Sequence, residues 1–184
     1  MPDLTCLGKV LGGGFPAAAY GGRRSLMEQI APAGPVYQAG TLSGNPMAMA
    51  AGLATLDTLA RDGEWSSAER WATQAATAIA AASERAGVPV VVQRVGTMLT
   101  PFFTAGPVTD YAAARRTDRT AYARFFHALL ESGVYLPPSP FEAAFSSSVH
   151  GAAELERLEQ ALVTAWIPGR PRPEPIDRPP TRDV

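Results

Sequence analysis

The most informative part of this chain is a glycine-rich stretch with a single lysine: Leu7-Gly8-Lys9-Val10-Leu11-Gly12-Gly13-Gly14-Phe15-Pro16. Lys9 is the only lysine in 184 residues, whereas all the other basic residues are arginines. Arginine keeps its proton at any workable pH, but a desolvated lysine can become a free amine and attack a carbonyl. The stretch therefore indicates either a nucleophilic lysine or an ordinary surface lysine in a loop, and the surrounding segments decide between the two.

The composition argues against several classes of function. The net charge is −1 and the pI is about 6.1, so nothing indicates a nucleic-acid or membrane-surface partner. Cys6 is the only cysteine, which rules out an internal disulfide and favours a reducing compartment. The first residues lack the features of a signal peptide, and no apolar run reaches the length of a membrane span. We therefore expect a cytoplasmic globular protein.

The Gly8-Lys9 pair also invites comparison with the phosphate-binding loop of nucleotide hydrolases. That loop needs a glycine five residues before the Gly-Lys pair and a serine or threonine after it. Here Asp3 stands where the glycine is needed, and Val10 follows the lysine. The sequence therefore argues against nucleotide binding.

Hydrophobic periodicity and helix-breaking residues predict two structural units and a tail. The first unit, residues 1–61, holds the Lys9 loop and a helix that begins at Asn45, with Pro46 at its first position. The second, residues 62–167, alternates helices with short strands, and residues 168–184 form a Pro/Arg-rich tail that we expect to be disordered. The expected strands cover 4–7, 17–20, 88–92, 98–103, 134–136 and 145–148, and the expected helices cover 23–30, 45–61, 65–86, 122–130 and 154–166.

Two further motifs accompany the Lys9 stretch. One is Tyr37-Gln38-Ala39-Gly40-Thr41-Leu42-Ser43-Gly44-Asn45-Pro46, and the other is Pro138-Ser139-Pro140-Phe141-Glu142-Ala143-Ala144-Phe145-Ser146. Together the three segments resemble class III, fold type I aminotransferases that depend on pyridoxal phosphate, and within them the glutamate-1-semialdehyde 2,1-aminomutase subgroup. The first two motifs are specific to the class, and the third favours the subgroup. The resemblance covers residues 2–166 and corresponds to the carboxy-terminal part of such an enzyme.

The resemblance implies an α/β fold that comprises the end of the large cofactor-binding domain and the small α/β domain. It implies that Lys9 forms a Schiff base with pyridoxal 5'-phosphate and then moves protons between substrate and cofactor. It places Gly40 and Thr41 against the cofactor phosphate of the neighbouring subunit, which makes a homodimer necessary. Without the lysine, Gly40-Thr41 would be read as an ordinary turn ahead of a helix cap.

Two more residues receive a role from the resemblance alone. Glu142 matches a catalytic glutamate that helps to position the amino groups of the substrate, although a solvent-facing glutamate at a strand edge explains it equally well. Its position within an apolar strand would be unfavourable unless the carboxylate were paired. Tyr37 matches a tyrosine near the cofactor and substrate, with a packed aromatic residue as the simpler alternative.

The implied reaction is the isomerisation of glutamate-1-semialdehyde, a small amino-aldehyde, to 5-aminolevulinate for tetrapyrrole (porphyrin) biosynthesis. In this reaction the cofactor enters as pyridoxamine phosphate. The alternatives are a class III ω-aminotransferase with another substrate and a non-catalytic remnant that only dimerises or binds an intact subunit. Enzymes of the class carry the aspartate that pairs with the pyridinium nitrogen on their amino-terminal side, and residues 1–184 hold none at a matching position. We therefore expect weak cofactor affinity and doubtful activity from this chain alone.

Overall fold

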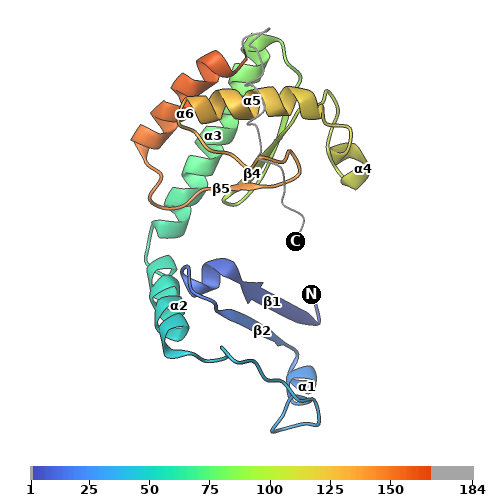
Figure 1. The fold of residues 1–184 in the computed structure, drawn as a ribbon, viewed down its shortest axis with the longest axis vertical. Coiled ribbons are helices and arrows are strands. Elements are labelled where there is room, and N and C mark those ends of the chain that lie inside the picture. Colours follow the sequence, from blue (N-terminus) through green and yellow to red (C-terminus); the bar gives the residue numbers. More distant parts are fainter. Residues whose placement is uncertain (1, 167–184) are drawn as a thin grey trace, which may run out of the picture. The chain divides into compact units, whose positions relative to one another are not determined.

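The computed structural model describes residues 2–166, which form two compact units (Figure 1). One unit ends at Glu64 and the other begins at Trp65. The predicted tail over 168–184 lies outside the described residues. None of the helices in the described part of the chain is long and apolar enough to cross a membrane.

The first unit begins with two antiparallel strands, β1 (Leu4–Gly8) and β2 (Ala18–Gly22), paired in register from Leu4↔Gly22 to Gly8↔Ala18. The 3-10 helix η1 (Lys9–Gly12) follows β1 directly, so the Lys9 stretch forms the connection between the two strands. Helix α1 (Arg24–Met27) is shorter than the predicted 23–30, because the chain turns at Ile30 to pair with Val36.

Helix α2 (Pro46–Leu59) begins where the sequence predicts it. Asn45 is the N-cap, its side-chain oxygen accepts from the backbone N–H of Ala48 at 3.0 Å, and Pro46 occupies the first turn, where a missing N–H does no harm. The buried residues of α2 are the small ones, Ala48 and Gly52. This small-residue face allows the η1 backbone to approach the helix closely.

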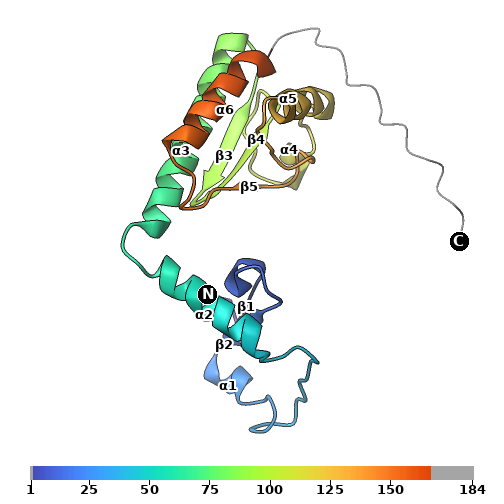
Figure 2. The ribbon, with the colours of Figure 1, turned by 60° about the vertical axis from the view of Figure 1, so that its left-hand side comes forward.

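The second unit combines a three-stranded sheet with helices (Figure 2). Helix α3 (Glu64–Ala86) leads into β3 (Val91–Val95), which pairs antiparallel with β4 (Met98–Phe102), and β4 pairs with the short β5 (Ala144–Phe145). The remaining helices are α4 (Tyr111–Ala114), α5 (Arg119–Glu131) and α6 (Ala152–Ala165). The predicted helices over 65–86, 122–130 and 154–166 are confirmed, whereas α4 was not predicted.

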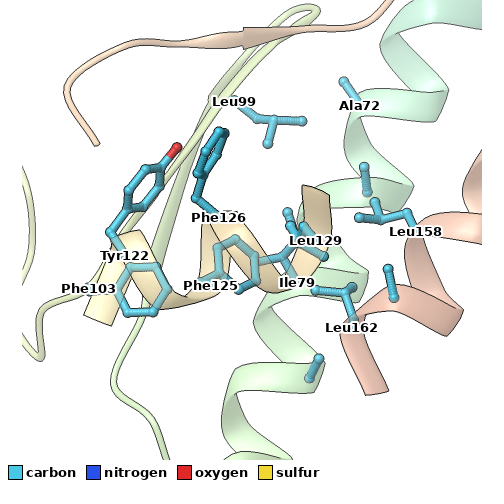
Figure 3. Close-up of a cluster of buried hydrophobic side chains, with 13 residues drawn as sticks. Ala72, Ile79, Leu99, Phe103, Tyr122, Phe125, Phe126, Leu129, Leu158 and Leu162 are labelled. Carbon is cyan, nitrogen blue, oxygen red and sulfur yellow. The ribbon is translucent and has the colours of Figure 1, made fainter. Parts of the chain in front are cut away.

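The core of the second unit lies between its helices and β4 (Figure 3). Helix α3 contributes apolar residues spaced by three and four positions, which places them on one face. Helix α5 contributes the large aromatic side chains, and α6 closes the cluster with Leu158 and Leu162. The full set of buried members is Ala72, Ala75, Ile79, Ala82, Leu99, Phe103, Tyr122, Phe125, Phe126, Leu129, Leu158, Ala161 and Leu162.

Three predicted strands differ from the structure. The strand predicted at 145–148 is the two-residue β5, which begins one residue earlier and ends at Phe145. The run predicted at 88–92 begins as a strand only at Val91, because the N–H of Val88 caps α3 on the Ser83 carbonyl and Pro89 has no N–H to donate. The strand predicted at 134–136 is wrong. There the N–H of Val134 caps α5 on the Leu129 carbonyl and two prolines follow at once, so no ladder forms.

Candidate active site

Lys9 is the first residue of η1, directly after β1, and its side chain is exposed. Its backbone φ is 56°, and it is the one non-glycine residue in the described part of the chain with a positive φ. A side chain in this left-handed region is strained, and such strain concentrates at functional sites. Within the described residues the Lys9 ammonium has no ion-pair partner.

Close backbone contacts with α2 hold the Lys9 loop in place. A Cβ on Gly13 would lie 2.4 Å from Thr55 Oγ1 and 3.1 Å from the Ala51 carbonyl oxygen, and the φ of Gly13 is also 56°. In the opposite direction, a Cβ on Gly52 would lie 3.1 Å from the Leu11 carbonyl oxygen. Two glycines, one on the loop and one on the helix, therefore let the two backbones meet.

Gly40 and Thr41 lie in the turn that leads to α2. The N–H of Ser43 donates to the Gly40 carbonyl at 3.0 Å, and the side chain of Asn45 donates to the Leu42 carbonyl at 3.1 Å. Thr41 is exposed, with its hydroxyl in no hydrogen bond within the described residues. A small exposed turn with free donors can receive an anionic oxygen.

Tyr37 does not pack within the first unit. Its side chain is 82% exposed, so the alternative reading of a packed aromatic residue is wrong for the described part of the chain. Lys9, Tyr37, Gly40 and Thr41 all belong to the first unit, but no hydrogen bond joins Lys9 to the other three there. Helix α2 is what connects them: the Lys9 loop packs against this helix, and the Gly40-Thr41 turn lies just before its first residue.

Glu142 belongs to the second unit and lies in a bend two residues before β5. Its carboxylate is exposed rather than within a strand, so no buried partner is needed for its charge. It borders a mainly apolar cavity of about 490 Å³. Trp71, Leu136, His150 and Arg157 are among the other lining residues.

Tyr122 on α5 is a polar residue near Glu142 to which the sequence alone assigned no role. Its ring is 2% exposed, and its hydroxyl donates to the Pro137 carbonyl at 2.5 Å. Burial, reinforced by the negative charge of Glu142, raises the pKa of Tyr122 from 10.0 to about 12. The hydroxyl therefore keeps its proton, and remains a donor, throughout the physiological range.

No group of three or more histidine, cysteine, aspartate or glutamate residues within 2–166 could hold an ion. His150 instead stacks on Trp71, with 4.7 Å between ring centroids, and its Nδ1 accepts from the Ser147 N–H at 2.9 Å. A strained, exposed lysine beside a glycine-rich loop is the strongest chemical feature that the described residues offer.

Comparison with known protein families decides what this lysine loop belongs to. Residues 1–143 match the profile of the class-III aminotransferases. The chain belongs to this family. The fold that the sequence predicted is thereby confirmed, because fold type I transferases of this family match the chain in structure as well.

Curated relatives of this class-III aminotransferase chain include aminomutases. It is 52% identical to the glutamate-1-semialdehyde 2,1-aminomutase of Desulforudis audaxviator and 55% identical to that of Pelotomaculum thermopropionicum. Each comparison covers 90% of this chain but only 38% of the relative. The chain thus spans less than half the length of the curated relatives it matches.

Solved structures with a similar fold include both enzyme types that the sequence left open. An omega-transaminase from Sphaerobacter thermophilus superimposes with a TM-score of 0.77 at 28% identity, over 90% of this chain and 38% of that one. A glutamate-1-semialdehyde aminomutase from Pseudomonas aeruginosa in complex with PMP superimposes with a TM-score of 0.78 at 24% identity, over 90% and 39%. Fold similarity therefore does not separate the two activities.

Proposed function

We propose that this chain carries the reactive-lysine part of a glutamate-1-semialdehyde 2,1-aminomutase, a cytoplasmic isomerase that forms 5-aminolevulinate for tetrapyrrole biosynthesis. Identity of 52% and 55% to curated aminomutases, over 90% of this chain, carries this proposal. The proposed cofactor is pyridoxal 5'-phosphate, which enters the cycle as pyridoxamine phosphate. The transaminase with another substrate is the second candidate, supported by the equal quality of its structural match.

The residues present suit such a cofactor. An aldehyde needs a primary amine, and Lys9 holds the only side-chain amine of the chain on an exposed, strained backbone position. A phosphate needs N–H and O–H donors, and the exposed Gly40-Thr41 turn supplies both kinds. When bound, the cofactor would supply an electron sink beside the substrate carbon from which a proton is removed.

The roles of the chain's own residues follow from their chemistry. Lys9 would hold a proton at Nζ and move it between substrate and cofactor carbons, which arginine cannot do. Gly40 and Thr41 would bind the phosphate of the cofactor in the neighbouring subunit of a homodimer. The absence of any hydrogen bond from Lys9 to either residue within the described chain agrees with such sharing. Tyr37 and Glu142, both exposed, would contact the substrate.

The first test moves the lysine without changing the composition. The double variant Lys9→Arg with Arg61→Lys keeps every residue count and places the amine at an exposed position at the end of α2. The full chain and this variant would be mixed with pyridoxal phosphate, reduced with borohydride and mapped by peptide mass. We expect the label on Lys9 of the natural chain and no more than background labelling of the variant.

The reaction itself is tested in the longest polypeptide that the native gene encodes around this chain. Given glutamate-1-semialdehyde alone, an aminomutase forms 5-aminolevulinate with no second amino donor or acceptor, whereas a transaminase does not turn over. The Lys9→Arg variant serves as the inactive control. Turnover that appears only after an amino acceptor is added would replace the aminomutase proposal by the transaminase.

A further inference from the structure

The segment that carries Glu142 cannot be held by ordinary strand pairing. It reads Pro137-Pro138-Ser139-Pro140-Phe141-Glu142, and its three prolines have no N–H to donate to a neighbouring strand. The structure assigns no strand to these residues. Their position must therefore come from side chains of other elements that reach their carbonyl groups and rings.

The first attachment is the hydroxyl of Tyr122 on α5. It donates to the Pro137 carbonyl at 2.5 Å, at the start of the segment. The ring that carries it packs edge-on against Phe103, with 5.9 Å between centroids, and also contacts Phe125 (Figure 3). Because the ring is locked in the core, the hydroxyl is a fixed point rather than a mobile donor.

The far end of the segment is held by weaker contacts. The Glu142 N–H donates to the Ser139 carbonyl at 3.2 Å, which closes a turn. The Arg119 guanidinium lies 5.0 Å from the centre of the Phe141 ring, and the Thr100 hydroxyl lies 3.5 Å from the Glu142 carbonyl oxygen. The bond made by Tyr122 is the shortest of these attachments, and it is partly buried, whereas the Thr100 contact is exposed.

We propose that Tyr122 is a positioning residue for Glu142, because its hydroxyl holds the Pro137 carbonyl and thereby fixes the segment that ends at the glutamate. The purpose of this positioning rests on the proposed function, in which Glu142 contacts the substrate. The mechanical part of the proposal, that the Tyr122 hydroxyl holds the segment in place, does not depend on the proposed function. Tyr122→Phe removes the hydroxyl, keeps the ring in the core and leaves the Pro137 carbonyl without its donor.

The mechanical part is tested in the full chain by NMR-detected amide exchange. Tyr122→Phe should accelerate exchange at the Phe141 and Glu142 amides by roughly fivefold, the effect of losing one ordinary hydrogen bond, while the Ile79 amide in α3 stays unchanged. Tyr111→Phe is the matched control, because it removes an exposed hydroxyl from the same unit. Unchanged exchange at both segment amides, or equal acceleration at Ile79, would overturn the proposal.

The functional part is tested by a double-mutant cycle in the longest native polypeptide. Tyr122→Phe should lower kcat for aminomutase turnover about fivefold, with little change in KM, in the natural background. In a Glu142→Gln background it should have no further effect, because its action passes through Glu142. Additive losses would overturn the positioning role. If the natural polypeptide shows no turnover, the proposed function fails, and the exchange result alone decides the positioning.

Discussion

Lys9 and Gly13 share a φ of 56°, but for different physical reasons. Gly13 needs the left-handed backbone and the absence of a side chain because Thr55 and the Ala51 carbonyl oxygen of α2 lie against it. Lys9 carries a side chain in the same strained region of the backbone, and that side chain is exposed. A glycine would occupy this position more easily, and this agrees with the proposal that Lys9 serves through its amine.

Replacement of Gly13 by alanine tests how firmly the loop depends on α2. The new Cβ would meet Thr55 Oγ1 and the Ala51 carbonyl oxygen, so we expect a loss of about 1–3 kcal/mol in the stability of the first unit. Gly14→Ala is the matched control, since Gly14 also has a positive φ but has no atom within 4 Å of the added carbon. Amide exchange in α2 provides the measurement, and equal effects of the two variants would show that the helix contact contributes nothing.

At the scale of elements, the long helices were predictable, although α5 and α6 begin three and two residues before the predicted 122 and 154. Asn45-Pro46 marks the start of α2 by local chemistry alone, and the apolar spacing in α5 and α6 is enough to place both helices. The limits of the strands were less predictable. The N–H of Val88 caps α3, so β3 begins later than predicted. The segment at 134–136 forms no strand, because the N–H of Val134 caps α5 and two prolines follow Leu136. The contact of Tyr122 was invisible in the sequence, because its acceptor lies fifteen positions away and only the fold brings them together.

The start of α6 gives a prediction about pH. Glu154 accepts from the Gly151 N–H at 2.7 Å, and the backbone N–H groups of Gly151 and of Glu154 itself lower the pKa of this carboxyl. A lowered folded pKa means that the carboxylate stabilises the fold above its ordinary pKa of 4.5, and that this stabilisation is lost as the pH falls through the folded value. Glu154→Gln should therefore unfold more easily than the natural chain near neutral pH.

Urea unfolding at about pH 7 and about pH 3 measures this difference, which should shrink or vanish in acid. Glu156→Gln is the matched control, because Glu156 lies on the same helix and contacts only the Gln160 side chain within the described residues. A difference between Glu154→Gln and the natural chain that persists unchanged in acid would contradict the capping role.

At the scale of the whole molecule, burial is very unevenly distributed. Ala48 is the one buried hydrophobic side chain in the described part of the first unit, whereas the second unit holds the whole aromatic and aliphatic cluster. The first unit also exposes large apolar side chains such as Leu4, Val10 and Leu53. We therefore expect the second unit to be the more stable of the two, and association between subunits to bury part of the exposed apolar surface.

Mixed dimers test the proposed sharing of the cofactor site. Lys9→Arg removes the amine, and Thr41→Asp disrupts the Gly40-Thr41 turn proposed to bind the phosphate. In the longest native polypeptide, the homodimer of either variant should be inactive. A mixed dimer pairs the intact lysine of one subunit with the intact turn of the other, so one site per dimer should recover activity. Refolded mixtures assayed for 5-aminolevulinate provide the measurement, and mixtures as inactive as their components would argue for a site built within one subunit.

The exposed position of Lys9, at the end of β1, has a practical consequence. A protease that cuts only after unmodified lysine has a single target in this chain and would release a nine-residue peptide, Met1 to Lys9. Any group fixed covalently on Nζ blocks that cut. Gel mobility after digestion would thus report, without a spectrum, what fraction of the molecules carry a modified Lys9.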